Sequence, residues 1–236
     1  MIYRLRRCDI RLASKRYANF VCSIFLLYKI DMLTSSTRYA KTLFSRIKKG
    51  EKMSKIVLAS QSPRRKEIME TAGFEFEIIV SNAEEKIEEN LSPEEVAKSL
   101  SLQKAQAVAV DNPEKIVIGA DTIVVLDNEI LGKPKDRNDA YKMLKKLSGK
   151  AHKVYTGIAV ICGEKIVNEA VSTEVEFYEL SDDEIIKYIE TNEPMDKAGS
   201  YGIQGRGCLL VKGIKGDYFN VVGLPIATLS KIIKEF

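Results

Sequence analysis

Residues 55–73 read KIVLASQSPRRKEIMETAG and contain one complete structural unit. The apolar run 55–59 predicts a short buried strand, and the residues from Pro63 onward have the spacing of a helix. Ser62 suits the N-cap of that helix, Pro63 suits its first position, and Gly73 suits its end. The stretch therefore predicts a strand, a polar loop and a helix, which is the beginning of an α/β fold.

The rest of the chain adds further helices and some long antiparallel segments. Capping boxes at residues 92–95 and 181–184 mark the starts of two helices, and Asp127-Asn128 predicts a hairpin turn. Other strands are expected at residues 76–80, 116–126, 129–131, 154–161, 165–178 and 208–211, and other helices at 139–147 and 225–236. The long β runs exclude a plain doubly wound sheet. We expect an α/β fold with a mixed twisted sheet and flanking helices, arranged as two lobes around one cleft.

The charge of the chain divides it into two parts. The 236 residues are 45% hydrophobic and 30% charged, which is enough for a real core and excludes a disordered, collagenous or disulfide-stapled protein. Residues 1–52 carry 13 Lys and Arg against three acids, whereas residues 53–236 carry 24 against 30. We therefore separate a basic N-terminal extension, 1–52, from a functional domain, 53–236, that has no general excess of positive charge.

The basic extension has several possible interpretations. Its apolar stretch, residues 20–28, is far shorter than the roughly 20 residues that cross a membrane, and no small-residue cleavage site follows it. An Arg-rich, acid-poor start resembles an organellar transit peptide, and a basic arm could also bind DNA. A simpler hypothesis is translated leader sequence, because residues 48–52 can be encoded by a purine-rich ribosome-binding sequence just before Met53.

Cysteine and histidine usage excludes two kinds of site. The four cysteines show no CxxC spacing, and the single histidine, His152, cannot complete a Cys/His zinc site. The same histidine lies in a segment that we interpret as a loop, which disfavours a Ser-His-Asp hydrolase. A reducing, cytoplasmic setting fits best.

The loop that precedes the first helix is a candidate phosphate site. Ser60 and Ser62 leave backbone N–H groups free at a helix N-terminus, and Arg64 and Arg65 add positive charge where the helix dipole already favours an anion. The two arginines can also lie on a solvent-exposed face of the helix. However, positive charge in the first turn of a helix is unfavourable with the helix dipole unless an anion is bound there. The chain has no Walker motif as an alternative phosphate site. Its two Gly-Lys pairs, at Lys133 and Lys150, are not followed by the Ser or Thr that such a motif requires.

Asp121 is the strongest single functional candidate. It interrupts the apolar run 116–126, where an ionised carboxylate is unfavourable unless a cation or metal meets it. Gly119 and Ala120 beside it leave room for a close approach. The alternative is a structural aspartate that is protonated or paired with a lysine. Together with Lys104 and Lys133, it has the composition of a metal–nucleotide site, whereas Glu85 on spacing alone is ordinary surface charge.

A glycine-rich segment, residues 196–205, presents Gln204 between glycines. Such a segment suits a tight backbone excursion, and the Gln204 amide can donate and accept hydrogen bonds to the edge of a base. A flexible surface loop is nearly as good an interpretation on sequence alone.

Taken together, residues 58–65, 119–122, 132–134 and 196–205 resemble the motifs of the Maf family of nucleotide pyrophosphatases, in the same order and spacing. The resemblance covers residues 54–236. It implies a fold related to the inosine-triphosphate pyrophosphatases, a homodimer, and hydrolysis of a nucleoside triphosphate to the monophosphate and pyrophosphate with Mg²⁺ or Mn²⁺. A membrane or stable nucleic-acid partner is not implied.

The resemblance also implies residue roles. Asp121 matches the general base and, with Glu85, the metal side of the site. The residues that match phosphate-binding positions are Ser60, Arg64, Lys104 and Lys133. The residues that match the specificity positions of the subgroup acting on dTTP and UTP, rather than on 7-methyl-GTP, are Arg65, Thr122 and Gln204. The expected role is nucleotide-pool sanitation, and the alternative is a nucleotide-sensing regulator of cell division or septum formation.

Overall fold

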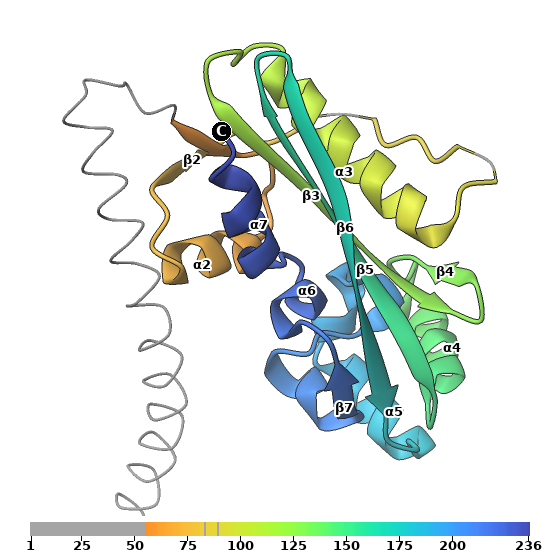
Figure 1. Cartoon of the computed structure of the whole chain (residues 1–236). Coiled ribbons are helices and arrows are strands. Elements are labelled where there is room, and N and C mark those ends of the chain that lie inside the picture. Colours follow the sequence, from red (N-terminus) through yellow and green to blue (C-terminus); the bar gives the residue numbers. More distant parts are fainter. Residues whose placement is uncertain (1–54, 83, 89) are drawn as a thin grey trace, which may run out of the picture. The chain divides into compact units, whose positions relative to one another are not determined.

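The computed structural model describes residues 55–82, 84–88 and 90–236, so our interpretations of residues 1–52 lie outside the described part of the chain. Its centre is a seven-stranded sheet of order β2-β1-β3-β5-β6-β7, with β4 paired to one end of β3 (Figure 1). The strands are β1 (Ile56–Leu58), β2 (Phe76–Ile78), β3 (Ile116–Leu126), β4 (Glu129–Leu131), β5 (Ala151–Cys162), β6 (Lys165–Phe177) and β7 (Val211–Lys215). β1 pairs in parallel with β2 and β3, and all other pairs are antiparallel. The mixed α/β sheet is therefore confirmed.

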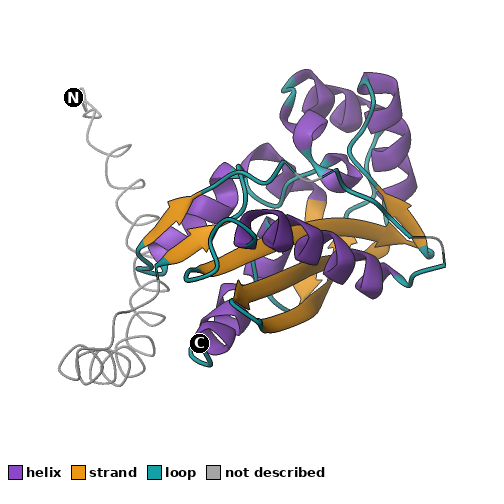
Figure 2. Cartoon of the chain, turned by 90° about the horizontal axis from the view of Figure 1, so that it is seen from above, coloured by secondary structure: helices purple, strands orange, loops and turns teal. Residues whose placement is uncertain are grey.

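Helices cover both faces of this sheet (Figure 2). The α-helices are α2 (Pro63–Thr71), α3 (Pro93–Ala109), α4 (Arg137–Leu147), α5 (Asp182–Glu190), α6 (Tyr218–Val222) and α7 (Ile226–Ile233). Three short 3-10 helices, η1 (Glu193–Asp196), η2 (Ala198–Ser200) and η3 (Gly205–Leu210), lie between α5 and β7. Both predicted capping boxes are formed, at the starts of α3 and α5. No helix among these described residues has the length and apolarity to cross a membrane.

Alternating residues of β3 divide the core between the two faces. Ile118 and Ala120 pack with α2 and α7, and Val124 and Leu126, further along the same face, pack with α4 and α5. Val117 and Ile123, on the other face, pack against α3. The face opposite α3 thus carries two separate hydrophobic clusters, one for each of the two predicted lobes.

Helix α3 lies unusually close to the sheet, because two strand residues opposite it are glycines. A Cβ at Gly119 would come within 2.3 Å of the Ser101 carbonyl oxygen, and a Cβ at Gly157 within 2.0 Å of the Ala97 carbonyl oxygen. These contacts involve helix backbone, so a side-chain rotation cannot relieve them. The space that the sequence suggested beside Gly119 is therefore filled by α3 and not by a ligand.

Most predicted elements are present, with three differences. His152 is buried in β5 and is not a loop residue, because β5 begins three residues earlier than expected. The predicted strand at residues 208–211 is mostly the 3-10 helix η3, and the strand β7 begins at Val211. The short helix α6 (Tyr218–Val222) was not predicted, since five residues give too little periodicity to recognise.

We predict that Gly157→Ala lowers the free energy of unfolding by about 3 kcal/mol, because the α3 backbone must move to admit the methyl group. Gly213→Ala is the matched control, since no atom lies within 4 Å of a Cβ at that position. Urea denaturation measures both, and the control should change by less than about 0.5 kcal/mol. Equal stabilities of the two variants would show that α3 does not lie so close to the sheet.

Candidate active site

A gap along one edge of β3 opens the site. On that edge β1 pairs with β3 as far as Ile118, and β4 begins to pair only at Val124. Between these points, the edge of β3 has no strand partner within the described part of the chain. Side chains from both faces of β3 can therefore reach the same space, which lies at the carboxyl end of β1, where ligands of α/β sheets commonly bind.

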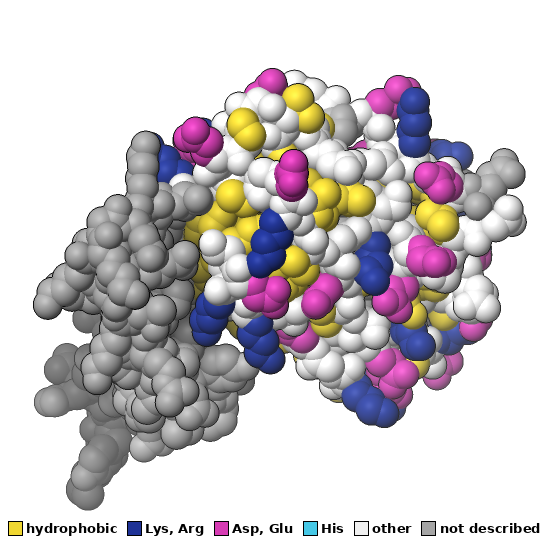
Figure 3. Space-filling view, turned by 45° about the horizontal axis from the view of Figure 1, so that its top comes forward, with side chains coloured by type: hydrophobic (Ala, Val, Ile, Leu, Met, Phe, Trp, Pro, Cys, Tyr) yellow, Lys and Arg dark blue, Asp and Glu magenta, His cyan; other side chains and the backbone are white. Residues whose placement is uncertain are grey.

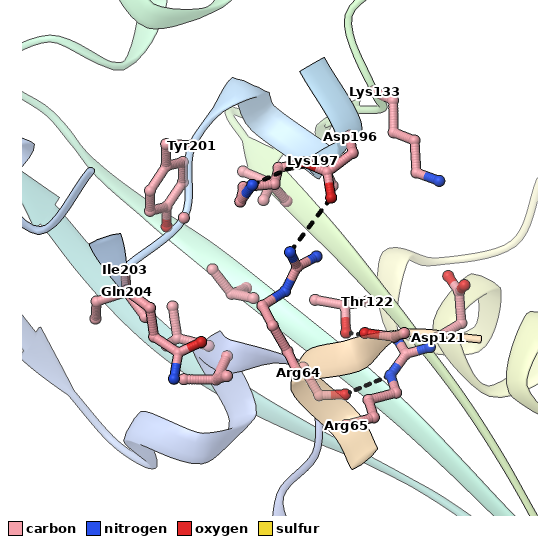
Figure 4. A pocket seen from close by; sticks show the side chains of 18 of the residues that line it. Arg64, Arg65, Asp121, Thr122, Lys133, Asp196, Lys197, Tyr201, Ile203 and Gln204 are labelled. Atoms are coloured by element: carbon pink, nitrogen blue, oxygen red, sulfur yellow. Dashed lines mark hydrogen bonds and ion pairs between the residues drawn. The ribbon is translucent and has the colours of Figure 1, made fainter. Parts of the chain in front are cut away.

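The pocket at this gap lies between the two lobes (Figure 4). It is lined from α2 by Arg64 and Arg65, from α3 by Lys104, and from β3 by Asp121 and Thr122. On the other side it is lined by Lys133, Asp196, Lys197, Tyr201 and Gln204. Its charged lining consists of five cationic side chains and two carboxylates, although residues 53–236 as a whole carry more acids than bases. This local excess of positive charge favours an anionic ligand.

Arg65 is a cation that is held only by neutral groups. Its Nε donates to the Gly223 carbonyl oxygen at 2.8 Å, and its two terminal nitrogens donate to Ser60 Oγ and Thr122 Oγ1, both at 3.2 Å. Burial lowers the pKa of Arg65, and the nearby Asp121 carboxylate offsets part of this effect. These hydrogen bonds fix the guanidinium in the pocket without a direct carboxylate partner. The positive charge of Arg65 can therefore attract a bound anion without first leaving a carboxylate.

Arg64 joins the two lobes across the pocket. Its Nη1 lies 3.3 Å from Asp196 Oδ2, and Lys197 Nζ lies 2.7 Å from the other oxygen of the same carboxylate. The carboxylate side chain of Asp196 is 64% exposed, so this is a solvent-screened pair of modest strength. A phosphate group could therefore replace Asp196 as the partner of Arg64 at little energetic cost.

Asp121, Glu85 and Lys104 form one charged cluster. The Lys104 ammonium contacts Asp121 Oδ1 and lies 3.0 Å from Glu85 Oε1. A cation thus meets the strand carboxylate, as the sequence required. The lysine pairing alone would also suit a structural aspartate, but Asp121 lies on the pocket wall, which gives it access to a ligand.

Lys133 and Gln204 face the pocket with their polar groups free. Neither side chain makes a hydrogen bond or ion pair with another side chain or backbone group in the described part of the chain. Lys133 follows β4, and Gln204 lies in the segment before η3 on the pocket lining (Figure 4). Both can therefore bind a ligand without first breaking an internal interaction.

The structure brings the predicted site residues together, but not all of them line the pocket. Ser60 accepts a hydrogen bond from the Arg65 guanidinium and Glu85 pairs with Lys104, but neither of the two lines the pocket. The sequence missed Lys197 and Tyr201 as lining residues. Both lie within the glycine-rich motif, so their position beside Gln204 was the available signal.

Tyr201 connects the pocket to a buried aromatic cluster. Its hydroxyl lies 2.7 Å from His152 Nε2, and the rings of His152, Tyr201 and Phe177 contact one another edge to face. Burial lowers the pKa of His152 to about 4. The imidazole is therefore neutral at pH 7 and supports Tyr201 by packing and hydrogen bonding, not by charge.

Fold and site together define a mixed α/β protein with a cation-lined pocket for a phosphorylated ligand. The model of Maf-like proteins matches residues 55–236, so the chain belongs to the Maf family, which confirms the resemblance. A dTTP/UTP pyrophosphatase of Bacillus cereus (strain ATCC 10987 / NRS 248) is 55% identical over 189 residues, which cover 80% of this chain and 93% of the relative. A protein of the same name from Bacillus cytotoxicus is 55% identical over 184 residues, covering 78% and 96%. The Ham1 protein structure of Staphylococcus aureus aligns with a TM-score of 0.41 at 18% identity, covering 77% of this chain and 99% of that one.

We predict that His152 titrates with a midpoint near pH 4, well below the value of about 6.5 for an exposed histidine. Because the unfolded chain then binds this proton more tightly than the folded chain, stability should fall by about 3 kcal/mol as the pH drops from 6.5 to 4. The chain contains a single histidine, so one NMR imidazole resonance reports the midpoint. A midpoint near 6.5 would mean that the ring is exposed to solvent.

Proposed function

We propose that the chain hydrolyses dTTP and UTP to the monophosphate and pyrophosphate. The observation that carries the proposal is one pocket that combines five cationic side chains with a carboxylate, Asp121, at the open edge of the sheet. The 55% identical relatives are named dTTP/UTP pyrophosphatases, which supports the same substrates.

In this proposal, cations from both lobes bind the triphosphate. Arg64 approaches it from the start of α2, and Lys133 approaches from the opposite wall. Ser60 keeps the Arg65 guanidinium in place, and Lys104 lies beside Asp121. Negative charge that develops on the leaving pyrophosphate is stabilised by groups that are already in position.

The proposal places a divalent cation beside Glu85 and Asp121. The Lys104 ammonium already lies between these carboxylates, so the site accommodates positive charge there. Among the described residues no cluster of three or more His, Cys, Asp or Glu side chains could hold a metal. Two carboxylates, with phosphate oxygens and water as further ligands, are typical of magnesium–nucleotide sites. Bound Mg²⁺ or Mn²⁺ would polarise the phosphoanhydride and neutralise part of its charge.

Asp121 is proposed as the general base. Its side chain is 14% exposed and lines the pocket, so its second oxygen can accept a proton from the attacking water. Lys104, which is itself paired with Glu85, contacts the other oxygen and so restricts the rotation of the carboxylate. The proposed general base therefore lies on the edge of the strand, and the cationic side chains proposed to bind phosphate lie on the helices and loops around it.

The proposed base-recognition groups are Gln204, Arg65 and Thr122. A uracil or thymine imide presents one N–H between two carbonyls, which the Gln204 amide can match with two hydrogen bonds. The amide can also flip to suit cytosine, so Gln204 alone discriminates weakly. Arg65 and Thr122, which are hydrogen-bonded to each other, complete the selection.

The direct test incubates the chain with dTTP, UTP, CTP and 7-methyl-GTP in the presence of Mg²⁺ or Mn²⁺. We expect monophosphate and pyrophosphate from dTTP and UTP, and less turnover of the other two nucleotides. The products can be separated by anion-exchange chromatography. Release of orthophosphate instead of pyrophosphate would contradict the reaction, and omission of the metal tests the cofactor.

We predict that Asp121→Asn reduces kcat at least about a hundredfold with little change in KM, because the amide keeps the size of the side chain but cannot accept the proton. Asp127→Asn is the control, since Asp127 lies in the hairpin turn after β3 and does not line the pocket. Steady-state kinetics and thermal melting distinguish lost chemistry from lost folding. Normal turnover by Asp121→Asn would exclude Asp121 as the base.

The proposal also includes a cytoplasmic homodimer that removes unwanted nucleotides from the pool. The two cysteines in the described residues, Cys162 and Cys208, are free thiols, as expected in a reducing compartment. On the face shown in Figure 3, acidic and basic side chains are interspersed with no continuous basic patch, which argues against stable nucleic-acid binding there. Light scattering of the purified chain tests the dimer.

A further inference from the structure

The segment that carries Gln204 is held by residues that do not line the pocket. Gln204 itself makes no side-chain hydrogen bond with the rest of the described chain, so its position depends on the backbone of residues 202–207. This backbone is hydrogen-bonded to the corner between α5 and η1, in the lobe that contains α4 and α5. The residues at that corner are Tyr188, in the last turn of α5, and Glu193, the first residue of η1.

Glu193 binds one end of the segment with both carboxylate oxygens. Its Oε2 accepts the Arg206 N–H at 2.9 Å, and its Oε1 accepts the Gly207 N–H at 3.0 Å. Desolvation opposes the charged form of Glu193, but these backbone hydrogen bonds, the Tyr188 hydroxyl and the charge of Lys197 together outweigh it, so the pKa of the carboxyl is lowered. A carboxylate that accepts two adjacent N–H groups fixes the direction of the chain there.

Tyr188 binds the other end and links it to Glu193. Its hydroxyl accepts the Gly202 N–H at 3.2 Å and donates to Glu193 Oε1 at 3.0 Å. The ring is buried in the hydrophobic cluster formed with α4, so the hydroxyl has little freedom to move. The two ends of the segment are thus tied to one hydrogen-bonded pair.

The glycines of the segment show how tightly it is packed against this pair. Gly205 has a φ of +68°, and a Cβ there would come within 2.7 Å of a Glu193 carboxylate oxygen. A Cβ at Gly207 would come within 2.2 Å of the Gly202 carbonyl oxygen and 2.6 Å of the Tyr188 hydroxyl. The backbone excursion that presents Gln204 is therefore closed at its base by Glu193 and Tyr188.

We propose that Glu193 and Tyr188 are positioning residues that hold residues 202–207 in the shape that presents Gln204 to the nucleotide base, and so set base selectivity without touching the substrate. The inference rests on the proposed function and deepens it. It assigns selectivity to a hydrogen-bonded pair outside the pocket.

The test uses Glu193→Gln in the full chain, because the amide keeps the size of the side chain but places an N–H₂ group against a backbone N–H. We expect KM for UTP to rise about tenfold, the effect of losing one hydrogen bond to the base, and the UTP-to-CTP ratio of kcat/KM to fall. The kcat for UTP and the inhibition constant of inorganic tripolyphosphate, which has no base, should change less than about twofold.

A double-mutant cycle shows whether Glu193 acts through Gln204. In a Gln204→Ala background, Glu193→Gln should have no further effect on KM. Tyr188→Phe, which removes only the hydroxyl, should reproduce the rise in KM and keeps the test valid if Glu193→Gln does not fold. Tyr141→Phe is the matched control, since its hydroxyl donates to the exposed Asp182 and it does not line the pocket.

The outcomes separate the two proposals. A wild-type chain that releases no pyrophosphate from UTP or dTTP overturns the proposed function, and this inference with it. An active wild type whose KM and selectivity are unchanged by Glu193→Gln and Tyr188→Phe overturns the inference alone. A rise in KM, a fall in kcat and a weakening of tripolyphosphate binding of equal size, all persisting in the Gln204→Ala background, would show a general structural role. This result would also overturn the inference.

Discussion

The close approach of α3 to the sheet is the constraint on which the site depends. Gly119 and Gly157 allow the helix backbone to lie directly against β3 and β5. Because the helix lies this close to the sheet, Lys104 reaches the carboxylate of Asp121, two residues beyond Gly119. A larger residue at either glycine would push α3 outward and separate the charged pair. Packing of the fold and electrostatics of the site are thus set by the same contact.

The second requirement is the unpaired stretch of β3 between β1 and β4. A strand carries side chains alternately on two faces, so Asp121 and Thr122 would normally be separated by the sheet. The gap in pairing lets both line one pocket, and the end of β1 leads directly into the loop and helix that bring Arg65. Asp121, the proposed general base, lies on one face of the sheet, and Thr122, proposed to help recognise the nucleobase, lies on the other. Both can therefore act on one bound nucleotide.

Local sequence patterns predicted most elements because the signals are short-range. Capping boxes, the helix after Pro63 and the Asp127-Asn128 turn each depend on neighbouring residues, and all are present. The failures involve tertiary contacts. His152 is polar and lies shortly after Gly149, which suggested a loop, but the packing of Phe177 and Tyr201 around it accompanies a longer β5. Residues 208–211 are apolar enough for a strand. However, Glu193 accepts hydrogen bonds from the Arg206 and Gly207 N–H groups just before them, and the chain there forms the 3-10 helix η3.

The sequence by itself determined the family, the mixed α/β class and the residue types of the site, because motif spacing and local propensity are contained in short segments. It also required a cation for the buried-strand carboxylate, since an unpaired charge there is unfavourable. Only the tertiary structure decided that Lys104 supplies this cation, that Ser60 and Glu85 contact lining cations without lining the pocket, and that Glu193 and Tyr188 bind the Gln204 segment. These contacts join residues far apart in the chain, and they follow from how α3, the two lobes and the open edge of β3 fit together.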